Sequence, residues 1–403
     1  MFRAYRELFS APGTRWLLLA GLLARLPLPM TGIGIITLLA QLRGSYTLAG
    51  AVSATFVLSY ALLSPQVARL ADRHSQHRVL PVASAISLAG MLLLAATTYL
   101  QAPDGLLFVG ALLAGFMPGM SAMVRARWAA LYRGQPRLQS ANSLETVLDE
   151  VTFIAGPPLS VGLAVAAFPQ AGLLAAALLL AGGTLALVRL RATQPLTSSA
   201  PTAAVRGGSP IGQPGVRLLA LLMMAMGIIV GSVDVVSVAF AELSGQPAAA
   251  SLVLSAYAFG SCSAGLLFGA LRLTTPLHRQ LLVGGLAVAL TTLPLWLAAS
   301  ITTLTGAVLL AGVSFAPTMI IAMSLVERLV AVEKLTEGMS WLLAGLNIGV
   351  ALGAAVSGRL VDYFGLQAGF SVAIGAGAAI VLLAIAGSYR LGGTQRYRTE
   401  RNA

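Results

Sequence analysis

Long apolar runs that carry almost no charge recur along the chain, and they constrain its fold more than any other feature. Of the 403 residues, 57% are apolar and only 9% are charged, whereas soluble domains contain about 25% charged residues. A run of about 20 apolar residues is long enough to cross a bilayer as a helix. The sequence therefore predicts an all-α membrane protein and excludes an ordinary soluble enzyme, a disordered chain and a collagen-like repeat.

Twelve runs are long enough and poor enough in charge to be transmembrane helices. At about 20 residues each they use roughly 240 residues, which leaves no room for a large soluble domain. The first run is too long for a cleaved signal peptide and lacks a small-residue cleavage site. We expect the twelve helices at 15–41, 47–69, 79–100, 104–124, 142–167, 170–190, 216–241, 248–271, 279–300, 302–325, 336–358 and 366–388.

The positions of the positive charges predict how the chain is oriented. A net charge of +12 would favour nucleic-acid binding in a soluble protein. With the N-terminus inside, however, 22 of the 25 Lys and Arg residues lie in cytoplasmic segments, Arg43 and Arg359 lie outside, and Arg25 lies within a helix. This bias is the positive-inside rule of membrane proteins. It predicts a protein of the cytoplasmic (inner) membrane with both termini in the cytoplasm and no nucleic-acid partner.

The chain divides into two similar halves. The least apolar stretch, 193–215, is rich in Pro, Ser, Thr and Gly, which is typical of a flexible linker. It separates residues 1–192 from residues 216–403, and each part holds six predicted helices, with a short basic tail on the second. Parallel repeats of this kind place a substrate cavity between two bundles that rock against each other. Residues repeated between the halves include Gln170-Ala171-Gly172 with Gln367-Ala368-Gly369, Gly156 with Gly353, and Ser160 with Ser357.

The predicted cytoplasmic loop between the second and third helices carries a recognisable signature. Residues 68–80 read Ala-Arg-Leu-Ala-Asp-Arg-His-Ser-Gln-His-Arg-Val-Leu and resemble the loop motif Gly-x-Leu-x-Asp-Arg-x-Gly-Arg-Arg of the major facilitator superfamily. Asp72, Arg73 and Arg78 match the motif, whereas Ala and Ser replace its two glycines. The resemblance implies a cytoplasmic gate in which the Asp caps a neighbouring helix and pairs with Arg. The alternative is that these charges only set topology.

A second resemblance lies in the predicted fifth helix. The run Gly156-Pro157-Pro158-Leu159-Ser160-Val161-Gly162 is similar to the Gly-Pro-x-x-Gly-Gly signature of the drug:proton antiporters of this superfamily. Gly156 and Pro157 match the first two positions, whereas Ser160 and Val161 replace the last two glycines. The match implies a bend and close helix approach at this point. It favours export as the direction of transport.

Arg25 is the one positive charge predicted to lie deep in the membrane. It follows Arg15 by ten residues, which is about 15 Å at 1.5 Å per residue, and Pro27 and Pro29 after it should bend the first helix. An ionisable group at this depth costs several kcal/mol unless it is paired or hydrated, so it is a functional candidate. Many proton antiporters of the superfamily carry an Arg in the fourth helix. Here Arg125 stands only at its cytoplasmic end, so we expect Arg25 to supply the cation.

Carboxylates in the fifth helix are the expected partners of Arg25. Asn142 and Glu145 fit a capping box that begins this helix, and Asp149 and Glu150 then lie about 9–12 Å deep. The resemblance implies that the first and fifth helices are neighbours, which brings Arg25 within reach. Burial favours the protonated carboxylate and a nearby Arg opposes it, so we predict that this group couples transport to protons. A static ion pair is the alternative.

Two polar residues stand out in the second half. Asp234 is the only acidic residue of its predicted helices that lies away from their ends, and its neighbours are small or polar. It is predicted to carry a proton or contact a cationic substrate, with a cap at a helix break as the alternative. Asn347, in the eleventh helix, is either a polar cavity contact or a packing hydrogen bond.

Together these features predict a monomeric secondary active transporter that exports small amphipathic or cationic compounds in exchange for protons. The alternatives are a proton-coupled uptake symporter and a flippase of lipids or lysolipids whose headgroup binds Arg25.

The sequence has no phosphate-binding Gly-rich loop with Lys, and no cofactor is expected. All three His lie in predicted loops and no HExxH occurs, so neither a metal site nor an intramembrane enzyme is expected. A duplicated chain with a flexible linker also suits rocking bundles better than a channel.

Overall fold

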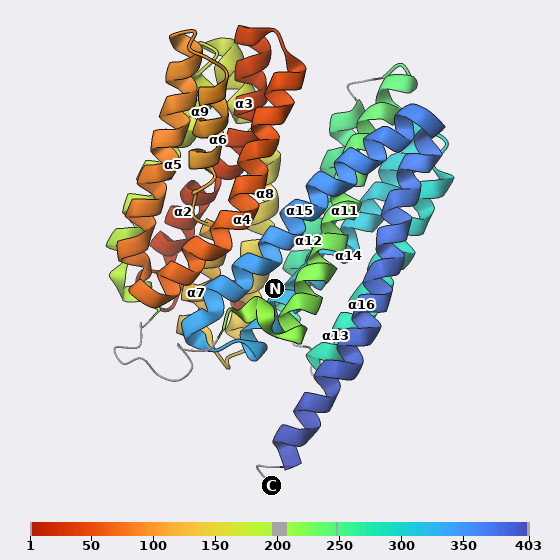
Figure 1. Cartoon of the computed structure of the whole chain (residues 1–403). Coiled ribbons are helices and arrows are strands. Elements are labelled where there is room, and N and C mark those ends of the chain that lie inside the picture. Colours follow the sequence, from red (N-terminus) through yellow and green to blue (C-terminus); the bar gives the residue numbers. More distant parts are fainter. Residues whose placement is uncertain (1, 196–207, 247–248, 272, 274, 401–403) are drawn as a thin grey trace.

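The computed structural model describes residues 2–195, 208–246, 249–271, 273 and 275–400, and the elements in these ranges are helical (Figure 1). Most of the predicted linker 193–215 lies outside the described residues. The elements of the first half are α1 (Phe2–Leu8), α2 (Thr14–Arg25), α3 (Pro27–Arg43), α4 (Tyr46–His74), α5 (Gln76–Tyr99), α6 (Gly105–Ala114), α7 (Met120–Tyr132), α8 (Arg137–Ala166), α9 (Ala171–Arg189) and the 3-10 turn η1 (Arg191–Thr193).

The second half repeats this pattern of long helices. Its elements are η2 (Pro210–Gly212), α11 (Pro214–Leu243), α12 (Ala249–Ala270), α13 (Leu277–Thr292), η3 (Leu293–Leu297), α14 (Ile301–Leu329), η4 (Val332–Lys334), α15 (Leu335–Phe364) and α16 (Leu366–Glu400). Among the described residues, eleven helical segments are long and apolar enough to cross a membrane, and α6 is a shorter apolar helix that lies between them in sequence. With α6 counted, the described chain agrees with the predicted twelve-helix fold.

Two of the predicted helices are interrupted. The first consists of α2 and α3, which are separated at Leu26. The break coincides with Pro27, which lacks the N–H that continues a helical ladder, and Leu26 itself keeps helical backbone angles (φ −53°, ψ −38°). The prediction of one continuous fourth helix at 104–124 is wrong. That helix ends at Ala114 and resumes as α7 after the sequence Gly-Phe-Met-Pro-Gly at 115–119.

The helices form two bundles that approach each other most closely at one end of the molecule (Figure 1). The first bundle comprises α2–α9 and the second comprises α11–α16. Helix α4 packs against α15, and α8 packs against α12 and α14. Both chain ends lie toward the end where the bundles meet, and the two ribbons diverge toward the opposite end. We call the end where the bundles meet the closed end.

Small residues allow close contact within each bundle. A Cβ atom on Gly349 of α15 would lie 2.0 Å from the main-chain oxygen of Met224 in α11, so only glycine permits this crossing. The repeated Ser and Gly positions lie close together in both halves. A Cβ on Gly172 would meet Ser160, and Ser357 donates a hydrogen bond to the main-chain oxygen of Gly369 at 3.3 Å. The internal repeat read from the sequence is therefore visible in the packing.

Candidate functional site

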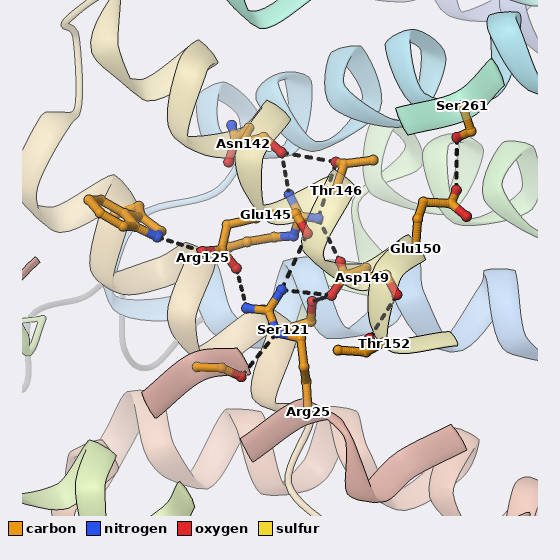
Figure 2. Close-up of polar contacts among 12 residues, drawn as sticks. Arg25, Ser121, Arg125, Asn142, Glu145, Thr146, Asp149, Glu150, Thr152 and Ser261 are labelled. Atoms are coloured by element: carbon orange, nitrogen blue, oxygen red, sulfur yellow. Dashed lines mark hydrogen bonds and ion pairs between the residues drawn. The ribbon is translucent and has the colours of Figure 1, made fainter. Parts of the chain in front are cut away.

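Arg25 is the centre of a buried polar network in the first bundle (Figure 2). It is the last residue of α2, and its guanidinium bonds to two carboxylates of α8. Its Nη1 lies 3.0 Å from Asp149 Oδ1, and its Nη2 contacts Glu145. Trp128 Nε1 donates to the other oxygen of Glu145 at 2.8 Å. The expected contact between Arg25 and the fifth transmembrane helix is therefore present, and it uses Glu145 and Asp149.

A second arginine, Arg125, shares this network. Its Nη2 lies 2.8 Å from Asp149 Oδ2 and its Nη1 donates to the main-chain oxygen of Asn142. Arg125 is fully buried in α7, so the expectation that it stands only at a cytoplasmic helix end is wrong. The sequence signal for this burial was Gly-Phe-Met-Pro-Gly at 115–119, which separates α6 from α7. The new helix α7 then places Arg125 in the protein interior. The fourth transmembrane helix therefore does supply a buried cation.

The charges of this network cancel. Arg25 and Arg125 carry two positive charges, and Glu145 and Asp149 carry two negative ones. Both guanidiniums and the Glu145 carboxylate are almost completely buried, and the Asp149 side chain is 15% exposed. Ser121 also bonds to Asp149. The arrangement joins three transmembrane helices of the first bundle and leaves no unpaired charge, which favours a structural role.

The predicted capping box at Asn142 is wrong. Helix α8 begins at Arg137, more than a turn earlier, with Pro136 in the N-cap position. Asn142 is therefore inside the helix and fully buried. Its Nδ2 donates at 2.9 Å to Glu327 Oε1 of α14. The side chain that resembled a cap instead joins the two bundles.

Glu150 lies apart from the Arg25 network, although Asp149 precedes it in sequence. Consecutive residues of a helix point about 100° apart, and Glu150 points toward the second bundle (Figure 2). Its Oε1 accepts a hydrogen bond of 2.8 Å from Ser261 Oγ of α12. Sequence reasoning grouped Glu150 with Arg25, but the structure places it at the contact between the bundles.

Asp234 and Tyr257 complete a second polar group around Glu150. Asp234, on α11, is exposed and lies within electrostatic range of Glu150. Tyr257, one turn before Ser261 on α12, is only 8% exposed and is within range of both carboxylates. Its hydroxyl has no hydrogen-bond partner among the described residues. We call Glu150, Asp234, Tyr257 and Ser261 the two-carboxylate site.

No described Lys or Arg forms an ion pair with either carboxylate of this site. The electrostatic neighbours of Glu150 include Asp149 and Asp234, which are themselves acidic. The Tyr257 ring packs on Phe315 of α14, with ring centroids 5.9 Å apart. Two carboxyl groups and a hydroxyl without a hydrogen-bond partner among the described residues thus lie within electrostatic range of one another, next to an aromatic pair. Such an arrangement can hold a cation with an apolar body.

Three other predicted site residues lie elsewhere. Asn347 Nδ2 donates to the Leu343 oxygen of its own helix at 3.0 Å, which is a local packing bond. A Cβ on Gly156 would lie 2.8 Å from Pro29 of α3, so this glycine is needed for helix approach. Helix α8 continues through Pro157 without interruption.

The loop motif lies at the closed end. Asp72 Oδ2 accepts a hydrogen bond of 2.9 Å from the main-chain N–H of Glu337, in the first turn of α15. This is the cap on a neighbouring helix that the resemblance implied. Arg73 and Arg78 are exposed and form no ion pair among the described residues. Arg69, which was not singled out, lies 3.9 Å from the Glu337 carboxylate instead.

Further hydrogen bonds join the bundles at the closed end. Ser140 of α8 donates to the main-chain oxygen of Gly269 at 2.7 Å, and Arg133 donates to that of Glu327 at 2.7 Å. Tyr5 donates to the Leu266 oxygen at 2.7 Å. Burial raises the pKa of Tyr5 to about 12, so its hydroxyl remains a donor at neutral pH. The closed end is thus held by polar contacts that must break before the bundles can separate there.

The fold is similar to that of several solved transporters. A bacterial homologue of the iron transporter ferroportin, in an outward-facing state, aligns with a TM-score of 0.75 at 18% identity, covering 93% of this chain and 99% of the other. The human organic anion transporter MFSD10 gives 0.71 at 16% identity, covering 93% and 100%. The Escherichia coli fucose:proton symporter gives 0.67 at 14% identity, covering 92% and 99%.

These identities are low, so the structural matches show the fold alone. No curated protein matches the sequence. Among the described residues, no group of three or more His, Cys, Asp and Glu side chains is placed to hold a metal ion. The model of the Major Facilitator Superfamily matches residues 17–240 and again residues 218–400. Because these matches span both halves, the chain belongs to the major facilitator superfamily and is a transporter, not an enzyme.

Proposed function

We propose that this transporter exports small organic cations in exchange for protons, by alternating access between its two bundles. The observation that carries the proposal is the two-carboxylate site. Glu150 belongs to the first bundle and Asp234 to the second, and neither has a cationic partner among the described residues. Glu150 is partly buried, and a carboxylate removed from bulk water requires a counter-cation or a proton. Asp234 is exposed and adds a second acidic group within electrostatic range of it. A cation and a proton that compete for the same carboxylate are exchanged for each other.

This proposal moves the coupling function away from Arg25 and Asp149. Their network is charge-balanced and buried, so adding a proton to it would leave a guanidinium without its partner. The cost of an uncompensated buried charge is several kcal/mol. We therefore assign Arg25 and Asp149 a structural role, and Glu150 and Asp234 the exchange of proton and substrate.

The surroundings of the two carboxylates indicate the kind of cation. Tyr257 and Phe315 pack on each other and are 8% and 6% exposed, so we infer that a cation reaches their faces only when the bundles move apart. Cations bind such faces with about 0.5–2 kcal/mol. The unpaired Tyr257 hydroxyl can donate to an acceptor on the substrate. These features suit an amphipathic amine better than a small inorganic ion. Arg25 is 5% exposed and committed to two carboxylates, so the flippase alternative loses the headgroup site on which it rested.

The distribution of charge supports the direction of the cycle. The arginine-rich segments lie toward the closed end, which we therefore place on the cytoplasmic side. The bundles diverge toward the other side (Figure 1), where protons can reach Asp234 and a bound cation can leave. Opening the closed end then exposes the same carboxylates to the cytoplasm, where the proton is released.

Proton exchange can be measured directly in proteoliposomes that contain a pH-sensitive dye. With an acidic lumen and added organic cation outside, we expect the cation to enter while the lumen becomes more alkaline. A neutral analogue of the same shape is the control and should move no protons. Lumen acidification on cation entry would indicate the symporter alternative. Cation entry that moves no protons would contradict coupling altogether.

Asp72 is expected to stabilise the closed end as a helix cap. Replacing it with Ala removes the bond to the Glu337 N–H, and loss of a cap costs about 1–2 kcal/mol. The equilibrium between the shut and open forms of that end should shift about 5- to 30-fold toward the open form. Transport should slow, because the state open at that end is then over-populated. Thiol labelling of a cysteine placed at the closed end measures the shift. Arg73→Ala, which removes an exposed side chain in the last turn of α4, is the matched control. An equal effect in both variants would refute the assignment.

A further inference from the structure

Glu327 is a buried carboxyl group at the closed end that no part of the proposed function uses. It lies in the last turn of α14, in the second bundle, and is 6% exposed. Its hydrogen bond from Asn142 Nδ2 crosses to α8 in the first bundle at 2.9 Å. This pair of side chains therefore exists only while the closed end is shut.

The Asn142 side chain has an unsatisfied acceptor beside this bond. Its Oδ1 is buried and receives no hydrogen bond among the described residues. An ionised carboxylate has no hydrogen to offer, so it can satisfy the amide N–H but not the amide oxygen. A protonated carboxyl group can do both, because one oxygen accepts from Nδ2 while the O–H donates to Oδ1. Leaving a buried acceptor unpaired costs about 1–3 kcal/mol.

Charged groups on several elements face Glu327. Arg125 of α7, Arg133 and the neighbouring Arg328 lie within electrostatic range and favour the ionised form. Arg125 is already paired with Asp149 at 2.8 Å. Arg133 is directed to the main-chain oxygens of Glu327 and Val330.

Within the described residues none of these arginines makes an ion pair with the Glu327 carboxyl group. The nearest acidic residue on α8 is Glu145, one turn from Asn142, and it is bound to Arg25. Burial without an ion pair, together with the unpaired Asn142 oxygen, opposes the effect of the three arginines.

We propose that Glu327 binds a proton while the closed end is shut, and that loss of this proton favours opening. Separation of the bundles breaks the Glu327–Asn142 pair and exposes the carboxyl group to water, where it ionises. Proton release and opening are then linked, and acidic conditions on that side hold the end shut. This site is distinct from the two-carboxylate site and does not depend on which substrate is carried.

The test measures how the rate at which the closed end opens depends on pH. The rate is followed by thiol labelling of the full chain without substrate. Cys262 is the only cysteine, so a Cys262→Ser background is free of thiols. Ser143→Cys then places a reporter next to Asn142, because Ser143 is fully buried and faces Gly269 of the other bundle. A maleimide reaches this position only when the closed end opens. The rate at each pH is divided by that of the unfolded protein, which removes the titration of the thiol itself.

We expect the normalised labelling rate to rise with pH, by up to about tenfold per unit for one linked proton. In Glu327→Gln the rate should remain slow at every pH, because the amide makes both bonds to Asn142 and cannot ionise. Glu242→Gln, which changes an exposed carboxyl group at the opposite end, should retain the original profile. A flat profile in the parent protein, or an unchanged slope in Glu327→Gln, would overturn the proposal.

A second variant decides the question if Glu327→Gln does not fold. Asn142→Asp places a second carboxyl group against Glu327, and two such groups retain a shared proton to higher pH. The midpoint of the labelling profile should therefore move upward, and an unchanged midpoint would overturn the proposal. Neither measurement involves transport, so its failure is distinct from failure of the proposed antiport.

Discussion

Replacing Glu150 by Gln is expected to weaken the binding of an organic cation by about 10- to 150-fold and to abolish its exchange for protons. The variant keeps the shape of the side chain and an acceptor for Ser261, but it loses the charge. A hydrogen bond to a charged group contributes about 1.5–3 kcal/mol, which corresponds to this range of affinity. Asp234→Asn should have a similar effect, because the two carboxylates share one site across the bundles.

Binding measured at two pH values, together with the proteoliposome assay, tests this expectation. Wild-type affinity should fall at the lower pH, since protons compete with the cation, whereas the Glu150→Gln variant should show much less dependence on pH. Ser261→Ala is the matched control, because it removes the hydrogen-bond donor and leaves the carboxylate in place. If Glu150→Gln retained pH-driven accumulation at the wild-type rate, proton exchange would have to be assigned to other residues.

Replacing Arg25 by Met is expected to destabilise the protein by about 3–5 kcal/mol. The substitution leaves Glu145 buried with only Trp128 as a side-chain partner, and a buried charge without its counter-ion costs this much. Adding Glu145→Met should recover much of the loss, since a buried pair can be replaced by apolar side chains at little cost. Unfolding in detergent by a chemical denaturant measures both changes.

Arg43 provides the comparison for Arg25. It forms an ion pair with Asp104 at 3.6 Å, but the Asp104 side chain is 53% exposed. An ion pair with one exposed partner contributes about 0–1 kcal/mol, and the bond from Arg43 Nη2 to the Ala102 main-chain oxygen adds about 1 kcal/mol. Arg43→Ala should therefore have a smaller effect than Arg25→Met. If Arg25→Met cost no more than Arg43→Ala and yet abolished transport, Arg25 would be a transport residue, as the sequence first indicated.

The loop resemblance predicted the residue that caps a neighbouring helix better than it predicted the arginine beside that cap. The loop signature led to Asp72, whose carboxylate does cap a neighbouring helix, but the arginine near that cap is Arg69 rather than Arg73 or Arg78. The cap could be predicted because the family resemblance implies it, although Asp72 and Glu337 are 265 positions apart. The choice among several arginines depends on which of them faces α15, and that depends on packing.

Glu327 and Arg125 show why the rest of the site could not be predicted. Arg125 was expected at the cytoplasmic end of the fourth helix, where Lys and Arg usually set topology, and Glu327 lies just beyond the predicted helix 302–325. The fourth helix breaks at 115–119, and its second part carries Arg125 into the core. Asn142 then becomes a residue inside α8 that reaches Glu327 across the bundles. No motif of this chain predicts the contact between Asn142 and Glu327, which are 185 positions apart.

The sequence alone determined the membrane class, the number of transmembrane helices, the duplicated halves and the burial of Arg25 beside carboxylates of the fifth helix. These follow from how much apolar length a bilayer requires and from the cost of charge in lipid, and both can be read along one dimension. Only the tertiary structure decided which charged side chains form ion pairs and which have no ion-pair partner among the described residues. Asp149 and Glu150 are adjacent in sequence, yet the turn of one helix directs the first to two arginines and the second to the opposite bundle.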